Sequence, residues 1–123
     1  MDGYKSLAAW QLAAELSERV LRATARPQRR AWAVVDQLRR AVVSADVNIV
    51  EGYALGTAPL YRRHLRIALG SAAEAERLLQ IAAEHDYLPP DVCTPLANLA
   101  DRTIGALYGL LRSRRLATRR NEG

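Results

Sequence analysis

Three observations predict an all-α fold, an antiparallel up-and-down four-helix bundle. Apolar residues recur every three or four positions through four long segments, which is the period of amphipathic helices. The connections between these segments are short and contain proline or glycine, so successive helices should run antiparallel. Half of the 123 residues are apolar, which is enough to fill the core of a single domain.

The first helix is predicted to span residues 5–23. Its polar residues form one narrow stripe, in which Glu15 precedes Arg19 at the favourable i,i+4 spacing. The Arg26-Pro27 step ends the segment, because proline restricts the residue before it and cannot continue a helix.

The second helix, about 29–54, carries more apolar surface than one core needs. Its inner face is formed by Val35, Leu38, Val42, Ala45 and Ile49. A second apolar set lies further round the helix and consists of Val34, Val43, Val47 and Val50. The positions left to meet water are mainly Asp36, Arg39 and Asp46. Because soluble monomers seldom expose a contiguous apolar patch, the second set should be buried between subunits of a homo-oligomer.

The third helix is predicted at 58–84 and the fourth at 91–113. The turn before the third helix reads Gly56-Thr57-Ala58-Pro59, in which glycine can end one helix and proline is tolerated in the first turn of the next. The bundle should occupy residues 1–116, followed by a basic tail at 117–123.

The second and third helices carry polar residues on the faces that should meet. In an antiparallel hairpin pivoting near residue 57, the numbers of facing residues sum to about 114. This rule predicts two ion pairs, Glu51 with Arg63 and Arg40 with Glu74, flanking a hydrogen-bonded centre. The complete predicted structural polar network is Arg40, Ser44, Asn48, Glu51, Arg63, Ser71 and Glu74.

Several motifs resemble those of a known protein family. They are Gln37-Leu38-Arg39-Arg40-Ala41, Ser44, Asn48-Ile49-Val50-Glu51-Gly52-Tyr53, Tyr61-Arg62-Arg63 and the run from Ala68 to Glu76. An opening set, Tyr4, Leu7 and Trp10, and a closing set, Gly109, Leu110 and Ser113, extend the likeness over nearly the whole chain. The sequence thereby resembles the bacterial four helix bundle protein family, whose founding members are encoded in intervening sequences of large-subunit ribosomal RNA genes. Asp46-Val47 and Val50 are mild departures from its pattern.

The resemblance implies the same bundle and, beyond it, a ring-shaped homopentamer. It also implies a distant likeness to the accessory variability determinant of diversity-generating retroelements, a bundle that partners a reverse transcriptase and binds nucleic acid.

No residue pattern points to catalysis, a metal or a cofactor. The Glu-x-x-His motif of di-metal bundles does not occur, and His64 is better explained as a packing or hydrogen-bonding residue. Glu51 and Glu74 should lie about 15 Å apart along the hairpin, too far to flank one bond. We therefore expect a non-enzyme, although an enzyme with a site between subunits stays open as the weakest alternative.

The single cysteine and the lack of long apolar runs bear on the compartment. Cys93 excludes an internal disulfide and fits a reducing environment, as a buried small hydrophobe or an inert surface thiol. No segment approaches the ~18 uninterrupted apolar residues of a membrane span. The expectation is a cytoplasmic protein with no membrane partner.

Nearly all of the net charge of +5 lies in the last twelve residues, where five arginines face only Glu122. Arginine offers forked donors to phosphate, so this pattern favours RNA or DNA binding that is largely independent of base sequence. The predicted nucleic-acid-binding residues are Arg62, Arg66, Arg112, Arg114, Arg115, Arg119 and Arg120. The alternative is a homo-oligomeric protein-interaction scaffold whose tail only keeps it soluble.

Overall fold

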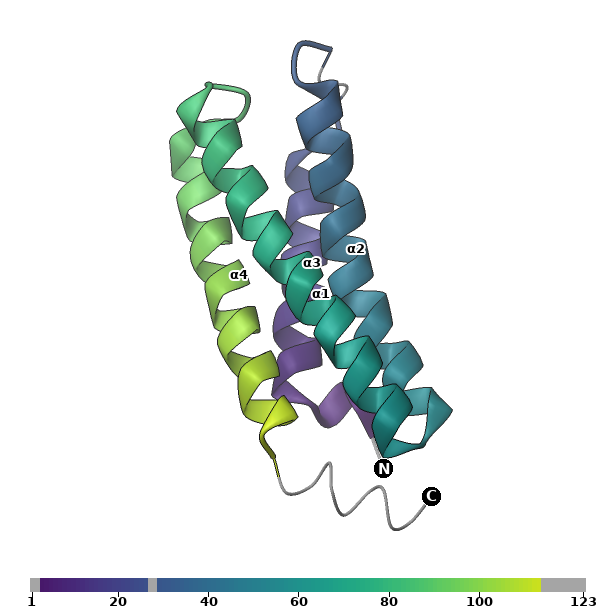
Figure 1. Ribbon diagram of the computed structural model, residues 1–123. Coiled ribbons are helices and arrows are strands. Elements are labelled where there is room, and N and C mark those ends of the chain that lie inside the picture. The colour runs from purple at the N-terminus through teal and green to yellow at the C-terminus, as the bar shows by residue number, and fades with distance from the viewer. Residues whose placement is uncertain (1–2, 27–28, 114–123) are drawn as a thin grey trace.

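The computed structural model describes residues 3–26 and 29–113, and it contains four α-helices. A short 3₁₀ turn, η1, comes first, and successive helices run in opposite directions (Figure 1). The elements are η1 Gly3–Ser6, α1 Ala8–Ala23, α2 Trp32–Leu55, α3 Ala58–Glu84 and α4 Pro90–Leu111. Each helix packs on its neighbours in sequence, and α1 also packs on α4. The prediction of an all-α fold with four packed helices is therefore confirmed.

The start of the chain departs from the predicted first helix. Residues 3–6 form the separate turn η1, in which the Ser6 hydroxyl donates a hydrogen bond to the Gly3 carbonyl at 2.9 Å. Leu7 is extended, so α1 begins only at Ala8. The expected start at residue 5 was wrong because the 3₁₀ turn uses the backbone groups that a longer helix would need.

The connection between α2 and α3 follows the predicted turn chemistry. Gly56 adopts a left-handed conformation with φ of 84°, which favours glycine and ends α2. Pro59 lies in the first turn of α3, where its missing N–H is tolerated. One turn before the end of α2, Gly52 is buried against α3, and a Cβ added to it would lie 2.7 Å from the Cβ of His64. The hairpin is therefore closed by direct contact of the two helices at this glycine.

The core between the helices has two buried clusters. The cluster nearer the α3–α4 turn contains Leu16, Leu38 and Leu79, and it includes the side chain of Cys93, which is only 1% exposed. The second cluster, nearer the α2–α3 turn, is centred on Leu65 and Leu107. Buried apolar side chains thus run along the length of the bundle.

Three arginines hold the C-terminal ends of neighbouring helices. The Nη1 atom of Arg39 on α2 donates to the α1 end, at 3.1 Å to the Leu21 carbonyl and 2.7 Å to the Thr24 hydroxyl. Arg62 on α3 donates to the Leu111 carbonyl of α4 at 3.0 Å, and Arg30 donates to the His85 carbonyl after α3 at 3.3 Å. A cation is stabilised there because the last carbonyls of a helix have no intrahelical partner and carry partial negative charge.

Two residues that were expected to meet water instead join α2 to α1. Arg39 makes the capping contacts described above, and Asp46 accepts a hydrogen bond from the Trp10 indole at 2.8 Å. This expectation was wrong because both side chains lie toward the side of α2 on which α1 packs.

Candidate nucleic-acid interface

The seam between α2 and α3 contains a continuous hydrogen-bonded chain. The Ser44 and Ser71 hydroxyls lie 2.8 Å apart, and the Asn48 amide nitrogen donates to the Ser44 carbonyl at 2.9 Å and to its hydroxyl at 3.1 Å. The Ser44 carbonyl can only accept, so the Asn48 atom beside it is the amide nitrogen. The side-chain oxygen of Asn48 therefore faces Nδ1 of His64 at 2.8 Å, and since this oxygen also only accepts, Nδ1 is the donor. The structure thus brings Ser44, Asn48 and Ser71 together, as predicted, and adds His64 to them.

One predicted ion pair is replaced by two other contacts. The Nε atom of Arg40 pairs with Asp36 at 3.0 Å, and Glu74 accepts a hydrogen bond from the Gln37 amide at 2.7 Å. The predicted pair of Arg40 with Glu74 was therefore wrong. Asp36 lies one turn away on the same helix, so the arginine reaches it without crossing to α3.

The second predicted ion pair is also absent from the described part of the chain. Glu51 lies 3.7 Å from Nδ1 of His64, and Arg63 forms no ion pair with any described residue. Arg63 is exposed on α3, whereas His64 faces the seam and is the residue within reach of Glu51. The register of the seam was predicted correctly, but the residue beside Glu51 is His64 rather than the preceding Arg63.

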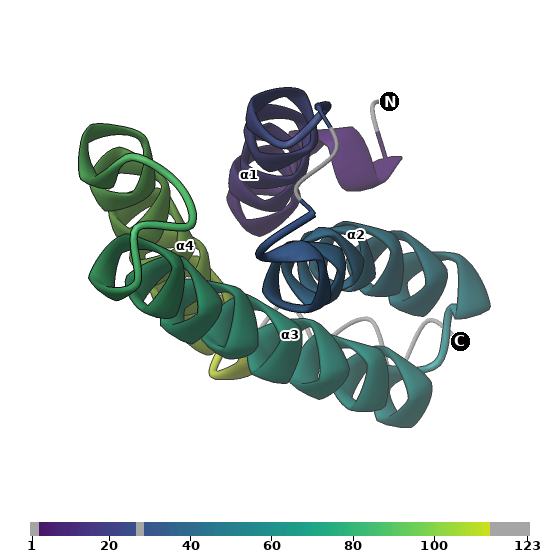
Figure 2. The same ribbon diagram turned by 90° about the horizontal axis from the view of Figure 1, so that it is seen from above.

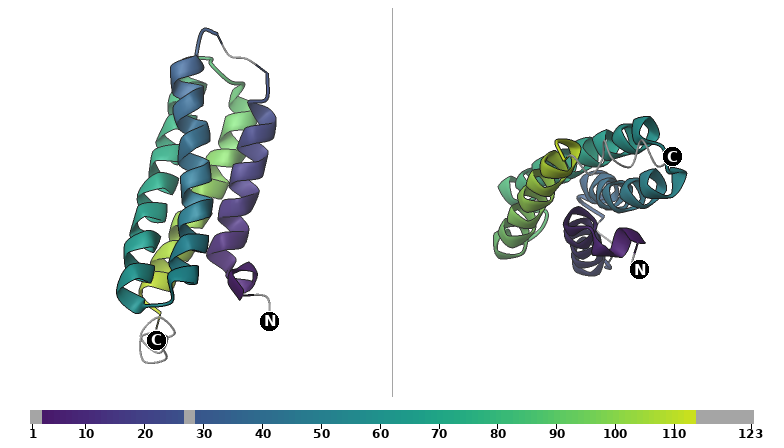
Figure 3. Two further views of the ribbon diagram at one scale, coloured as in Figure 1. Left: turned by 90° about the vertical axis from the view of Figure 1, so that its right-hand side faces the viewer. Right: turned by 90° about the horizontal axis from the view of Figure 1, so that it is seen from below.

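A region without carboxylates covers one end of the α3–α4 pair. Residues 52–73 and 102–113 contain no aspartate or glutamate, and we call these two stretches the basic end. The two stretches pack side by side. Arg62 donates a hydrogen bond to the Leu111 carbonyl, and both stretches contribute residues to one core cluster. Figure 3 shows that α4 ends at the same pole of the bundle at which α3 begins. Its arginines are Arg62, Arg63, Arg66, Arg102 and Arg112.

Four of these five arginines are available to a ligand. Arg63, Arg66, Arg102 and Arg112 are exposed, and none of them has a hydrogen-bonding or ion-pair partner through its side chain within residues 3–26 and 29–113. Arg62 differs, because its guanidinium is partly buried and caps α4. The basic end therefore presents cations whose charge is not neutralised by the described part of the subunit.

Elsewhere on the bundle, several exposed arginines within the helices lie beside carboxylates, although Arg29 before α2 has no ion-pair partner among the described residues. Arg19 pairs with Glu15 at 3.3 Å, and Arg22 pairs with Glu18 at 2.7 Å. Arg77, in the second half of α3, lies 3.2 Å from Glu84. These local pairs reduce the attraction for an external anion, so the positive potential should be strongest at the basic end.

The predicted nucleic-acid-binding residues differ in exposure and in their contacts. Arg66 and Arg112 lie on the exposed surface of the basic end, whereas Arg62 serves mainly as a cap. The other four predicted residues, Arg114, Arg115, Arg119 and Arg120, lie outside the described residues. Sequence reasoning missed Arg102 and the half-exposed ring of Tyr108, and it assigned Arg63 to an ion pair. The absence of acidic residues from 52–73 and 102–113 was the signal that would have identified all three.

Two carboxylates mark the boundary of the basic end on the α3–α4 side. Burial raises the pKa of Glu76 above its usual value of 4.5, and the nearby charge of Asp101 raises it further. Glu76 and Asp101 both lie outside residues 52–73 and 102–113, so they place negative charge beyond the basic end rather than within it.

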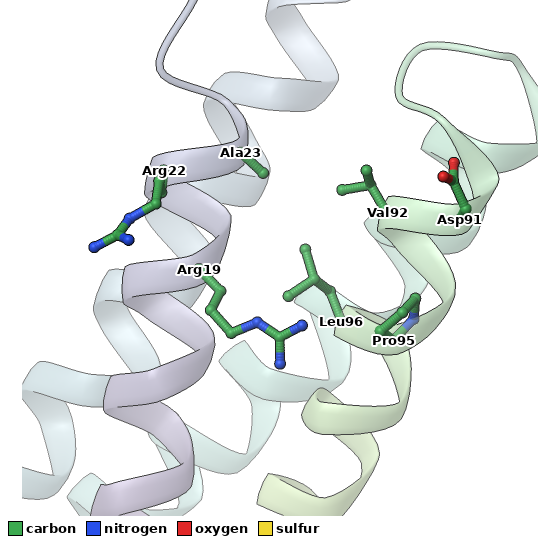
Figure 4. Close-up of a pocket in the computed structure, with 7 residues that line it drawn as sticks. All are labelled: Arg19, Arg22, Ala23, Asp91, Val92, Pro95 and Leu96. Carbon is green, nitrogen blue, oxygen red and sulfur yellow. The ribbon is translucent and has the colours of Figure 1, made fainter.

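A cleft between α1 and α4 is a weaker candidate for a site. It has a volume of about 460 Å³ at the end where these two helices stand apart (Figure 2). Figure 4 shows Arg19 extending toward α4 while Arg22 points away from the cleft. Both guanidiniums are paired with glutamates of α1, and the facing wall includes apolar Val92 and Leu96. The cleft therefore lacks a group of converging polar side chains.

The outer face of α2 and α3 exposes apolar side chains. Val43 and Val47 on α2 are 38% and 41% exposed, and Ile67 on α3 is 42% exposed. The two valines border a shallow groove of about 590 Å³ that also includes Ser44 and Asn48. Val43 and Val47 belong to the second apolar set of α2, for which burial between subunits is expected. Val34 of the same set instead packs against the core of its own subunit.

Comparison with models of protein families gives a match over most of the chain. The model of a family described as 23S rRNA-intervening sequence protein matches residues 5–109. A search of curated proteins finds no match to the chain. Within the described ranges, no three side chains of the metal-binding types lie together, and no helix is long and apolar enough to cross a lipid bilayer.

Proposed function

The chain belongs to the 23S rRNA-intervening sequence protein family, and from this premise we propose that it is a non-catalytic nucleic-acid-binding protein. It acts as a ribonucleoprotein accessory that contacts phosphates through arginines. An accessory role implies a protein partner, for which a reverse transcriptase is one candidate. RNA and DNA both fit, because phosphate contacts carry no base sequence information.

One observation carries this proposal, namely the free arginines of the basic end. Arg63, Arg66, Arg102 and Arg112 are exposed over two packed stretches that contain no carboxylate. Each phosphate that such a residue neutralises releases condensed counterions, which favours binding at low salt. The arginines that follow Arg112 in the sequence add to the same charge.

A homo-oligomer strengthens the proposed binding. The exposed Val43 and Val47 of α2, together with Ile67, supply an apolar surface for a second copy. In a ring-shaped homopentamer, five basic ends would belong to one particle, and several of them could engage one strand at high effective concentration.

A salt titration tests the proposed function. The dissociation constant of the full chain for a single-stranded RNA should rise steeply with salt concentration, and Arg63→Gln with Arg66→Gln should weaken binding at low salt. Each lost phosphate contact should reduce the slope of log K against log[salt] by about 0.7. Substituting glutamine for Arg114, Arg115, Arg119 and Arg120 measures the contribution of these C-terminal arginines in the same assay.

A matched control is available on α1. Arg19→Gln with Arg22→Gln removes the same charge but affects arginines that already pair with Glu15 and Glu18. This variant should retain most of the affinity. Equal losses in the two double variants would show that net charge alone is responsible, and absence of binding at low salt would reject the function.

The second candidate is a homo-oligomeric protein-interaction scaffold. The exposed apolar side chains of α2 and α3 favour it, since apolar patches mark protein contacts more often than phosphate contacts. An oligomer that binds no nucleic acid at low salt would support the scaffold over the first proposal.

A further inference from the structure

We infer that the ring of Tyr108 stacks on an unpaired base of single-stranded nucleic acid while Arg66 and Arg112 contact the flanking phosphates. This inference rests on the proposed function and names the form of ligand that the basic end binds. It adds an aromatic contact to a surface that otherwise provides only charge.

The ring of Tyr108 is open to a ligand. It is 51% exposed, and its hydroxyl has no hydrogen-bond partner among the described residues. Side chains of a helix lie over the turn before their own Cα, and for this tyrosine that turn contains Gly105. No side chain at that position can cover the ring.

The glycines beside Tyr108 are not required by packing within the subunit. A Cβ added at Gly105 or Gly109 would meet no atom within 4 Å. Glycine in a helix interior is unfavourable relative to alanine, yet the fold gains no close approach from either residue. Gly105 lies three residues before Tyr108 on the same helix face, and the open space there is what a flat base needs in order to reach the ring, whereas Gly109 lies toward α1.

Arginines lie on both sides of the ring. The Arg62 guanidinium is 3.0 Å from the Leu111 carbonyl, so one turn further along the antiparallel helices Arg66 lies opposite residues 107–108. Arg112 follows Tyr108 by four residues and therefore lies on the same helix face. An aromatic ring between two cations is the arrangement that binds a base together with its neighbouring phosphates.

The charges around the ring favour an anionic ligand. The nearest carboxylate on the same stripe of α4 is Asp101, seven residues before Tyr108 and about 10 Å along the helix axis. No acidic residue of α3 lies opposite the ring, since residues 52–73 contain none. A single strand fits better than a duplex, because the bases of a duplex are already stacked and paired.

The experiment compares two probes of equal charge with the full chain. One is a twelve-nucleotide single-stranded oligothymidylate, and the other has the same backbone without bases. The natural chain should bind the probe with bases about tenfold more tightly, since stacking on an aromatic side chain adds roughly that factor. A twelve-nucleotide oligouridylate and a duplex of equal length distinguish RNA from DNA and single strands from double strands.

Three variants assign the effect to the ring. Tyr108→Leu should lose about tenfold in affinity for the probe with bases and nothing for the probe without them. Tyr108→Phe should keep the natural affinity, because it retains the aromatic face. Trp32→Leu is the matched control, since Trp32 is 65% exposed at the opposite end of the bundle and should not affect binding.

The outcomes separate this inference from the proposed function. If Tyr108→Leu binds both probes as the natural chain does, stacking is excluded and phosphate binding stands. If the natural chain binds neither probe at low salt, the proposed function fails as well. If Tyr108→Leu weakens both probes equally and light scattering shows a smaller particle, the ring lies between subunits and the inference is overturned.

Discussion

Gly52 sets the distance between α2 and α3 near their turn. A Cβ at this residue would lie 2.7 Å from the His64 Cβ and 3.2 Å from a ring carbon of Tyr61. Neither neighbour can move freely, since Tyr61 is buried and His64 is held by Asn48. We expect Gly52→Ala to lower the free energy of unfolding by about 1–3 kcal/mol through overpacking, as measured by urea denaturation.

Gly105 is the opposite case and serves as the comparison. Its Cβ position is empty, so Gly105→Ala should gain helix propensity without a clash. We expect the free energy of unfolding to rise by up to about 1 kcal/mol in the same urea experiment. If both alanine variants changed stability in the same direction, the difference in packing between the two glycines would be refuted.

Glu76 gives the fold a dependence on pH. Burial raises the pKa of its carboxyl in the folded state, and Asp101 adds to the effect. The ionised form is therefore disfavoured by folding, and this residue's contribution to stability falls as pH rises from its ordinary value through the raised pKa. Glu76→Gln should be more stable than the natural chain at pH 7, and the difference should shrink toward pH 4.5. Urea denaturation at both pH values measures this change, and a difference independent of pH would contradict it.

The ends of the helices depend on contacts from neighbouring elements. Arg39 binds the end of α1 through the Leu21 carbonyl and both oxygens of Thr24. Arg39→Met keeps the apolar stem and removes these bonds, so it should lower the free energy of unfolding by about 1–3 kcal/mol. Arg40→Met is the control, because Arg40 forms one ion pair whose arginine side chain is 80% exposed and should contribute less than about 1 kcal/mol. Thermal and urea denaturation of both variants test the difference.

How well the sequence predicted each helix depended on local signals. The predicted bounds of α3, 58–84, agree with the structure because a left-handed glycine and a first-turn proline mark its start. The start of α2 at Trp32 was missed by three residues, since neither a left-handed glycine before it nor a proline in its first turn marks it. Arg39 as a cap could not be predicted, because the contact joins two helices whose relative rotation the sequence does not specify.

The α2–α3 seam shows the same limit for the candidate site. Short polar side chains such as Ser44 and Ser71 reach only their direct neighbours, so the register of the hairpin was sufficient to predict their contact. Long side chains have several partners within reach, and Arg40 pairs with Asp36 on its own helix. The arginines of the basic end are predictable as charges, but their freedom from ion pairs emerges only from the folded structure.

The molecule as a whole exposes the apolar side chains of Val43, Val47 and Ile67 on α2 and α3, which a second copy of the chain would cover. We expect the natural chain to form an oligomer in solution, in agreement with the ring proposed above. Val47→Glu should reduce the particle mass measured by light scattering, because a charge would be buried in the contact, while helix content by circular dichroism should remain unchanged. A natural chain that is monomeric at micromolar concentration would reject this expectation.

The even number of antiparallel helices places the first and last described residues, Gly3 and Ser113, at the same pole of the bundle as the basic end (Figure 1). A fluorescent label or affinity handle joined near either residue would crowd the surface to be tested. The turn between α3 and α4 lies at the opposite pole, where Asp86 is exposed. A reporter introduced at that turn would leave the arginines accessible and would report binding without obstructing it.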